Sequence, residues 1–285
     1  MNKQKIAILV DSGTDVPQDY VEKYDITVLP LKVIYKEREY LSGVDISAEE
    51  IYARLKEEIP KTSLPSYHDV VMALENIKNK GYEKVLAITI SSGLSGTFNS
   101  IRLAASEFEG LEVHMVDTKN ISIGAGFTVM HACDLIEEGK PWGTITKEVD
   151  ASVPDSKVYF CIPTLEYLQK GGRIGLVASL LGNVLGLKPI ISCNDEGIYY
   201  TVEKVIGWRK TVQKTIELAA KFAARGKKYN ICLVYGQLTQ EVKNISKLLK
   251  ETFIRAEEFR QQQVSPALGV HTGPGVIGIG MQVIH

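Results

Sequence analysis

Residues 84–100 read Lys-Val-Leu-Ala-Ile-Thr-Ile-Ser-Ser-Gly-Leu-Ser-Gly-Thr-Phe-Asn-Ser, an apolar run followed by a turn rich in hydroxyl groups. The apolar run Val85–Ile90 predicts a buried strand, and the residues after the turn predict a helix from Phe98 to about Glu107. A strand that ends in a polar turn and continues into a helix is the repeating unit of α/β proteins. We therefore expect an α/β fold.

The turn itself, Ser91 to Ser100, contains five hydroxyl groups, two glycines and no charge. The first turn of a helix has backbone N–H groups without partners, and the helix dipole places positive potential there. Such a turn can seat a small anion, for example a phosphate or a carboxylate. Serine also caps helices, but one hydroxyl is enough for a cap. The surplus favours an anion or a polar ligand head group.

Strand and helix patterns alternate through the first half of the chain, which predicts a largely parallel sheet. A loop bracketed by prolines, Pro60–Ser66, lies within this half. Besides the elements above, we expect strands at Ile6–Val10, Thr27–Tyr35 and Val113–Val116, and helices at Pro17–Tyr24 (opened by Asp15), Ala48–Glu58, Tyr67–Lys80 and Gly124–Glu138.

The pattern changes near residues 150–156, where we place a boundary between two α/β units. After it, Asn194–Gly197 is a hairpin turn signal between two strands. Residues Ile174–Leu187 predict an apolar helix with small residues, which could line a ligand or simply pack in the core. Further helices are expected at Arg209–Arg225 and Thr239–Phe253, and strands at Val158–Ile162, Asn230–Tyr235 and Val276–Ile284.

Composition and charge are those of an ordinary globular protein: of 285 residues, 45% are hydrophobic and 24% are charged. The formal net charge is −1, and no cluster of Lys and Arg stands out. These observations argue against binding to nucleic acid or to an anionic membrane surface.

The four cysteines and five histidines are scattered, so no metal-ligand spacing is present. Each cysteine has apolar neighbours, which predicts buried reduced thiols and a cytoplasmic protein. The apolar run after the N-terminus is too short for a signal peptide. The uncharged stretch Gln261–His285 contains glycines and prolines that disfavour a membrane-spanning helix, so we expect a soluble protein.

Partial matches to familiar catalytic motifs lack the residues or the flanking elements that these motifs require. Gly273–Gly278 matches G-x-G-x-x-G but is followed by a strand pattern rather than a helix, so it does not predict a dinucleotide site. Gly93–Thr97 lacks the last glycine of a nucleophile elbow. Asp11 and Asp15 could suggest a metal-dependent aspartate site, but a turn with a helix cap explains their spacing, and we favour the cap.

Polar, uncharged side chains remain as candidates for a binding site. Thr62, Ser63, Ser92 and Ser95 follow strand signals, and ligands of open α/β sheets collect at the carboxyl ends of strands. His271 lies among glycines, which indicates either an accessible imidazole or a buried structural histidine. Arg173 follows two glycines and is expected on an exposed turn, where a plain surface arginine is the alternative.

Six ordered motifs resemble the bacterial DegV family. They are Asp11–Asp15, Thr62–Ser66, Ser91–Ser100, Val116–Lys119, Leu165–Gly175 and Ser265–Gly278. Together they cover nearly the whole chain. The resemblance implies a two-lobed fold, with an N-terminal parallel-sheet α/β lobe (1–154) and a C-terminal mixed-sheet α/β lobe (155–285), together one domain of about residues 4–284. One departure is Leu64, where many members have a polar residue.

The resemblance also implies a function. Members bind a long-chain fatty acid such as palmitate, stearate or oleate, and some present its carboxylate to a separate ATP-using fatty-acid kinase subunit. By this resemblance, Thr62 and Ser95 would bond the carboxylate near His271, with Ser63 and Ser92 as alternative donors. Arg173 would serve the kinase encounter or the acyl-phosphate product. The chain would then be a carrier without catalytic residues or a cofactor, with at most transient membrane contact.

An alternative is an enzyme or phosphotransfer protein acting on a small polar metabolite, with phosphate at Ser91–Ser100 and His271 as nucleophile or base. The two lobes also resemble dihydroxyacetone-kinase-type proteins, which supports this alternative. The shape of the pocket distinguishes the two functions, because a carrier needs a long apolar tunnel and the enzyme a short polar cleft. A DNA-binding regulator is disfavoured, because no basic face or recognition helix is present.

Overall fold

A parallel sheet forms the centre of the N-terminal half in the computed structural model, which describes residues 2–180 and 186–285. All six residues of its strand β1 are buried, as is typical of a parallel strand covered on both faces. This confirms the predicted parallel sheet. Its strand order is β2 (Thr27–Leu29), β1 (Ile6–Asp11), β6 (Lys84–Thr89) and β7 (Glu112–Asp117).

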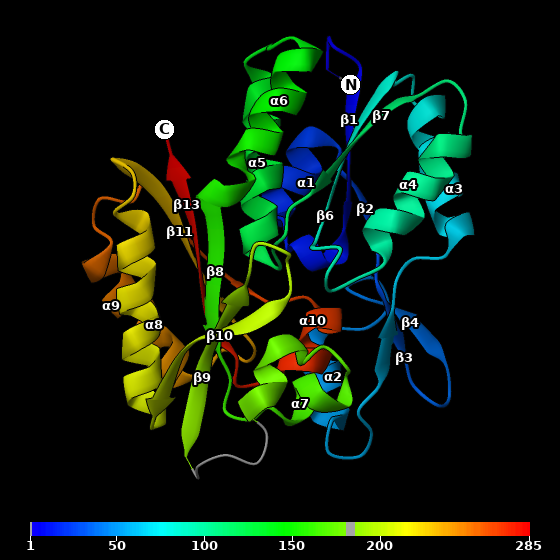
Figure 1. The fold of residues 1–285 in the computed structure, drawn as a ribbon. Helices are drawn as coiled ribbons and strands as arrows, with labels where there is room; N and C mark the ends of the chain where they lie inside the picture. Colours follow the sequence, from blue (N-terminus) through cyan, green and yellow to red (C-terminus); the bar gives the residue numbers. More distant parts are fainter. Residues whose placement is uncertain (1, 181–185) are drawn as a thin grey trace.

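Helices cover both faces of this sheet (Figure 1). Alternate residues of β1 point to opposite sides, so that Ile8 packs with one set of helices and Leu9 with the other. One side carries α3 (Tyr67–Asn79) and α4 (Thr97–Glu107), and the other carries α1 (Gln18–Tyr24), α5 (Ile123–Glu137) and α6 (Trp142–Ser152).

A six-stranded mixed sheet forms the centre of the C-terminal half. Neighbouring strands are antiparallel except β11 and β12, which are parallel. Its order is β10 (Tyr199–Ile206), β9 (Leu187–Cys193), β8 (Ser156–Cys161), β13 (Ile277–Ile284), β11 (Lys228–Tyr235) and β12 (Glu258–Gln263). The amphipathic helices α8 (Trp208–Ala223) and α9 (Gln240–Thr252) pack against it. The predicted mixed-sheet second lobe and its hairpin are confirmed.

Helix α5 lies between the two sheets (Figure 1). Twelve of its fifteen residues are buried, among them Phe127. Gly280 of β13 allows the close approach, because a Cβ there would lie 2.3 Å from Ile123 Cγ2. The chain passes from the first sheet to the second through α6 and the 3₁₀ turn η2 (Val153–Asp155). The division into lobes 1–154 and 155–285 stays a prediction.

A small antiparallel sheet lies below the parallel sheet in Figure 1, in the order β4 (Glu39–Leu41), β3 (Lys32–Ile34) and β5 (Lys61–Ser63). Around it lie α2 (Ala48–Arg54), α7 (Glu166–Lys170) and α10 (Pro266–Thr272), whose seven residues are all buried. Two short 3₁₀ segments complete the described elements, η1 (Ser12–Thr14) and η3 (Gly175–Leu180).

Several predicted elements were wrong. The predicted strand Thr27–Tyr35 is two strands in different sheets, interrupted at Pro30, which has no N–H to donate to a ladder. The predicted loop Pro60–Ser66 contains β5. The expected helix Ile174–Leu187 is a 3₁₀ segment over Gly175–Leu180 followed by β9 from Leu187, and residues 181–185 lie outside the described residues.

Asp11 and Asp15 have different roles from each other. Asp11 caps η1, because its Oδ1 accepts a hydrogen bond of 2.9 Å from the Gly13 amide, as the predicted cap requires. Asp15 does not open α1, whose N-cap is Pro17 with no side-chain bond, so that prediction was wrong. Among the described residues, no cluster of three or more His, Cys, Asp or Glu side chains could hold a metal ion.

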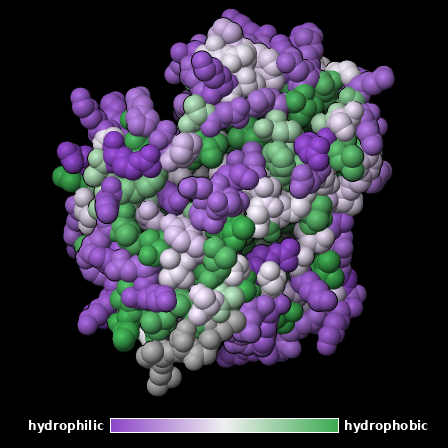
Figure 2. All heavy atoms as spheres, in the orientation of Figure 1, coloured by the Kyte–Doolittle hydropathy of each residue, from purple (hydrophilic) through white to green (hydrophobic). Residues whose placement is uncertain are grey.

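The surface and the thiols complete the description. Figure 2 shows a face on which hydrophilic and hydrophobic residues are mixed. The four cysteines are buried and unpaired, as the sequence predicts. No helix within residues 2–180 and 186–285 combines the length and the apolar character that a membrane crossing requires.

Candidate functional site

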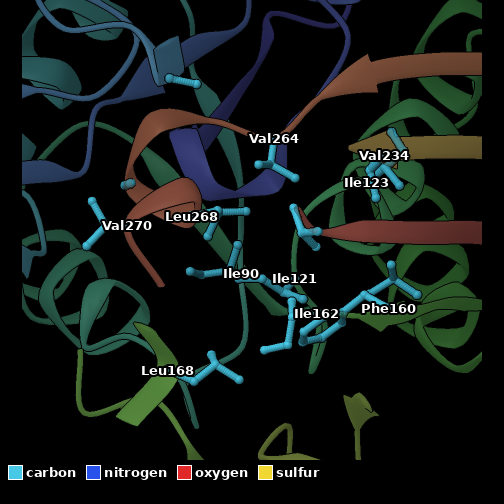
Figure 3. Packing of buried hydrophobic residues seen from close by; sticks show 14 of the residues in the cluster. Ile90, Ile121, Ile123, Phe160, Ile162, Leu168, Val234, Val264, Leu268 and Val270 are labelled. Carbon is cyan, nitrogen blue, oxygen red and sulfur yellow. The ribbon is translucent and has the colours of Figure 1, made fainter. Parts of the chain in front are cut away.

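Five of the predicted site residues line one enclosed cavity between the small sheet, the Ser91–Ser100 turn and α10. They are Thr62, Ser63, Ser95, Arg173 and His271. The remaining walls are mainly apolar and come from Leu31, Leu64, Ile90, Leu94, Ile121, Tyr199, Ala267 and Leu268. Figure 3 shows three of these, Ile90, Ile121 and Leu268, pointing toward one another from different segments. The site is therefore a polar group set into an apolar interior.

Thr62 and His271 form the centre of the polar part. Thr62 Oγ1 lies 2.7 Å from His271 Nε2, although 209 residues separate them in the chain. Thr62 is in β5, which pairs with β3, and His271 is in α10, which packs between α2 and α7. The other ring nitrogen, His271 Nδ1, is buried and has no hydrogen-bond partner.

Burial lowers the pKa of His271 to about 3, and the positive charge of Arg173 acts in the same direction. The imidazole is therefore neutral at physiological pH. Gly171 lies against this ring, because a Cβ at Gly171 would lie 2.1 Å from His271 Nδ1. The neutral ring can donate a hydrogen bond from one nitrogen and accept one at the other.

The five hydroxyl groups of the Ser91–Ser100 turn have different partners. Ser91 Oγ accepts from the Gly93 amide at 3.0 Å. Ser95 Oγ lines the cavity, lies 2.8 Å from Thr97 Oγ1 and accepts from the Thr97 amide at 3.3 Å. Several of these hydroxyl groups thus bond within the turn itself. Of the five, Ser95 lines the cavity.

Ser92 does not reach the cavity. Its hydroxyl accepts from Lys119 Nζ at 3.3 Å, and its amide donates to Asp117 Oδ1 at 3.1 Å. The spacing of Ser92 and Ser95 alone could not separate them, because both follow the same strand. They differ in the structure because Ser92 is hydrogen-bonded to Asp117 and Lys119 of a second loop, 117–119.

Arg173 is partly buried rather than exposed as predicted. Its Nη1 donates to the Gly171 carbonyl at 3.1 Å, and the residue lines the cavity beside His271. The structure therefore places a positive charge at the polar end of the cavity. Two tight turns with positive φ, at Gly172 and Gly175, flank this segment.

The cavity has a volume of about 40 Å³. A cavity needs about 10–15 Å³ by this measure to hold one water molecule, so this one has room for a small head group and not for a long chain. This cavity is too small to be the long apolar tunnel expected of a carrier. Larger hollows, of about 980 Å³ and 850 Å³, are open grooves on the surface, and the second is lined in part by Asp15, Ser42 and Ser265.

Most of the apolar wall residues have no distinguishing pattern in the sequence. Ile90 and Leu94 lie beside the hydroxyl turn, but Leu31, Ile121 and Leu268 come from three distant segments. These residues belong to the large buried cluster between the two halves, which also contains Ile162 and Leu168 (Figure 3). The cavity therefore borders a packed apolar interior.

Comparison with known proteins assigns the family. The model of the family described as "Uncharacterised protein, DegV family" matches residues 5–283. The chain belongs to the DegV family. A DegV domain-containing protein of Clostridium acetobutylicum is 39% identical over 276 residues, which are 97% of this chain and 98% of the relative. The resemblance stated from the motifs is thereby confirmed.

Solved DegV structures share the fold. A DegV family protein from Thermus thermophilus, described by its fatty-acid binding, matches with a TM-score of 0.91 and 30% identity over the full length of both chains. A stearic-acid-binding protein from Eubacterium ventriosum matches with a TM-score of 0.87 and 27% identity, covering 98% of each chain. The two-lobed α/β fold of this chain is thus the DegV fold.

Proposed function

We propose that this protein binds a long-chain fatty acid, with the carboxylate held by Thr62 and Ser95 and the acyl chain buried in the interior between the lobes. One observation carries the proposal. The Thr62 and Ser95 hydroxyl groups line the same apolar-walled cavity, and each is hydrogen-bonded to a buried neighbour, Thr62 to His271 and Ser95 to Thr97. The fatty-acid binding described for DegV relatives of the same fold supports it.

The hydrogen-bond pattern suits an anion. We assign the proton of neutral His271 to Nε2, so that it donates to Thr62 Oγ1 and leaves the Thr62 hydroxyl hydrogen for a ligand. In the same way, Ser95 Oγ accepts from Thr97 and can direct its own hydrogen into the cavity. Hydrogen bonds to a charged group contribute about 1.5–3 kcal/mol each, so two hydroxyls can orient a carboxylate without a salt bridge.

The acyl chain provides most of the affinity in this proposal. Burying about 14 methylenes at ~0.8 kcal/mol each yields roughly 11 kcal/mol, before the cost of association. The ligand must displace apolar side chains, because the cavity itself holds only a head group. Palmitate, stearate and oleate have the chain length for this role. Exposed hydrophobic residues such as Leu176 would allow brief contact with a membrane during loading.

We further propose that the protein is a carrier rather than an enzyme. An imidazole with a pKa of about 3 is a poor general base at neutral pH, which disfavours catalysis by His271. The carrier would present the carboxylate to a separate ATP-using fatty-acid kinase, with the Arg173 guanidinium beside the acyl-phosphate product. Four buried, unpaired thiols suit a reducing compartment such as the cytoplasm, and no resident cofactor is required.

Mass spectrometry of the purified protein tests the proposal. We expect one C16–C18 fatty acid per chain, released by denaturing solvent and retained under native conditions. The double variant Thr62→Ala with Ser95→Ala should lose the fatty acid and keep its fold. Ser92→Ala is the matched control and should retain the ligand, because Ser92 is bonded to Lys119 outside the cavity. Full retention in the double variant would refute the head-group assignment.

The role of Arg173 needs a separate experiment. Arg173→Ala should retain the fatty acid and slow its ATP-dependent phosphorylation by the fatty-acid kinase of the same bacterium. Loss of fatty acid from this variant would contradict the division of roles between Arg173 and the two hydroxyls.

A further inference from the structure

Asp15 is a buried carboxylate that joins three distant segments. It follows η1, is 9% exposed and has a left-handed backbone, with φ of 47°. Ser122 Oγ donates to its Oδ2 at 2.5 Å, and the Ser265 amide donates to its Oδ1 at 3.1 Å. Ser122 immediately precedes α5, and Ser265 immediately precedes α10. One side chain therefore fixes the start of both helices.

Helix α10 follows a strand of the second sheet but is held by groups of the N-terminal half. Besides the bond to Asp15, the Ala267 amide donates to Ser42 Oγ at 3.0 Å, and Gln262 Nε2 donates to the Asp15 carbonyl at 2.6 Å. The first amides of a helix have no partner within the helix, so the bonds from the Ser265 and Ala267 amides hold the start of α10, and the Gln262 bond holds the strand before it. His271 lies in the same short helix, and its distance to Thr62 depends on that start.

The surroundings of Asp15 are unusual for a carboxylate. No Lys or Arg pairs with it among the described residues. The titratable groups that interact electrostatically with it include Asp11 from β1, Tyr52 from α2, Tyr199 from β10 and Cys232 from β11. Burial raises the pKa of Asp15 to about 7, against the bonds from Ser122 and Ser265, and Asp11 adds to the rise. Its protonation therefore changes near neutral pH.

We propose that Asp15 is a positioning residue of the head-group site, which holds α10 in place so that His271 meets Thr62. Ionised Asp15 accepts strongly from the Ser265 amide, and the neutral acid accepts more weakly. The imidazole should therefore shift relative to Thr62 as Asp15 gains a proton. The proposal rests on the proposed function only where it concerns the ligand, because the link between Asp15 and His271 exists without one.

Two substitutions separate geometry from charge. Asp15→Asn keeps an acceptor for the Ser265 amide and offers an NH₂ to Ser122 Oγ, but it does not titrate. Asp15→Ala removes both bonds. Ser42→Ala removes the other bond to α10 without a titrating group, and Asp11→Asn removes the neighbouring carboxylate. These last two variants are the matched controls.

The first measurement is ¹⁵N NMR of the His271 imidazole, in protein stripped of lipid, from pH 5.5 to 8.5. We expect the wild-type resonances to shift with a midpoint near pH 7, although the ring itself stays neutral in this range. The shift should persist in Asp11→Asn and Ser42→Ala and vanish in Asp15→Asn. An identical titration in wild type and Asp15→Asn would overturn the proposal, and this comparison needs no ligand and no Asp15→Ala variant.

The second measurement is the dissociation constant for palmitate. Asp15→Ala should weaken binding roughly tenfold, the size expected for loss of one charge-assisted hydrogen bond, and Asp15→Asn should restore it to within about twofold at pH 8. Unchanged affinity in a folded Asp15→Ala would refute the positioning role. If the wild type itself does not bind palmitate, the proposed function fails, and the NMR comparison still decides the role of Asp15.

Discussion

Gly171 is the residue with the least room for a side chain at the candidate site. A Cβ there would lie 2.1 Å from His271 Nδ1. We expect Gly171→Ala to displace the imidazole, to lower the free energy of unfolding by about 1–3 kcal/mol and to weaken fatty-acid binding. Gly143→Ala in α6 is the control, because nothing lies within 4 Å of its Cβ position. Equal stability and binding in the two variants, measured by urea unfolding and palmitate titration, would contradict the steric argument.

The raised pKa of Asp15 has a defined effect on stability. Its pKa is about 7 in the folded protein and ordinarily 3.8, so the folded state binds more protons between these values. Asp15 therefore makes stability fall as pH rises from about 4 to 7, by up to about 1.4 kcal/mol per pH unit. Asp15→Asn should remove this slope and be more stable than wild type at pH 8, by about 1 kcal/mol or more, in urea unfolding. If Asp15→Asn were less stable than wild type at pH 8, this assignment of the pH dependence to Asp15 would be wrong.

His271 acts in the opposite direction in acid. Its pKa is about 3 when folded and ordinarily 6.5, so the unfolded chain binds the extra proton below pH 6.5. This group makes stability fall as pH drops from 6.5 toward 3. His271→Gln should therefore flatten the loss of stability in acid relative to wild type, as measured by thermal unfolding at pH 4.5 and 7. An unchanged acid profile would show that another group controls it.

At the scale of single residues, the polar residues that line the cavity could be predicted from the sequence better than the apolar ones. Thr62, Ser63 and Ser95 stood out as uncharged polar groups that follow strand signals, and His271 and Arg173 stood out by their neighbouring glycines. The structure brings all five to one cavity. Leu31 and Leu268 look like any other core leucine, so only the fold could assign them. Asp15 was misread as a helix cap because its partners are 107 and 250 residues away.

Among the elements, the β9–β10 hairpin shapes the site by packing its turn on Ser91. A Cβ on Gly197 would lie 1.8 Å from Ser91 Oγ, and a Cβ on Gly93 would lie 2.9 Å from the Gly197 carbonyl oxygen. The two turns thus meet through glycines, one from each half of the chain. This contact holds the strand end that leads to Ser95.

Gly197→Ala tests this packing against a closely matched control. Gly197 and Gly43 both have φ of +77°, but nothing lies within 4 Å of a Cβ at Gly43. Backbone strain should cost about 1–2 kcal/mol in both alanine variants. Gly197→Ala should cost a further 1–3 kcal/mol or so, because the turns must separate, and should also weaken fatty-acid retention. Equal losses of stability in urea unfolding would exclude a role for the contact.

Periodicity predicted the long elements and failed on short ones. The helix α3 has an amphipathic pattern and α5 a long apolar run, and the structure contains both helices and the parallel sheet. β3 and β5 have three residues each, too few for a pattern, and the apolar pattern after Ile174 fits a 3₁₀ segment and a strand as well as a helix. For such segments the tertiary partner decides the conformation.

For the whole molecule, α5 couples the two halves. Phe127 is fully buried, and the helix packs on both main sheets, so neither half can lose its structure without exposing this helix. We expect one cooperative transition, although chains of this length often unfold in steps. Trp142 and Trp208 lie in different halves, so the single-tryptophan variants Trp142→Phe and Trp208→Phe can follow each half by fluorescence.

The two tryptophan signals should change at the same denaturant concentration. Phe127→Ala should lower the unfolding midpoints of both signals together, with a loss of about 3–5 kcal/mol in the free energy of unfolding. Separate midpoints in the wild type, or a shift of one signal alone in Phe127→Ala, would show that the halves unfold independently.

The position of strand β13 in its sheet has a consequence for folding during translation. It is the last strand of the second sheet in sequence but lies between β8 and β11. A ribosome delivers residues in order, so β8 and β11 emerge before the strand that separates them. Until residues 277–284 are released, the nascent chain carries two unfinished sheet edges and an uncovered face of α5. A chaperone that protects apolar surface would be needed most during translation of the final tenth of the message, long after the hydroxyl turn has been made.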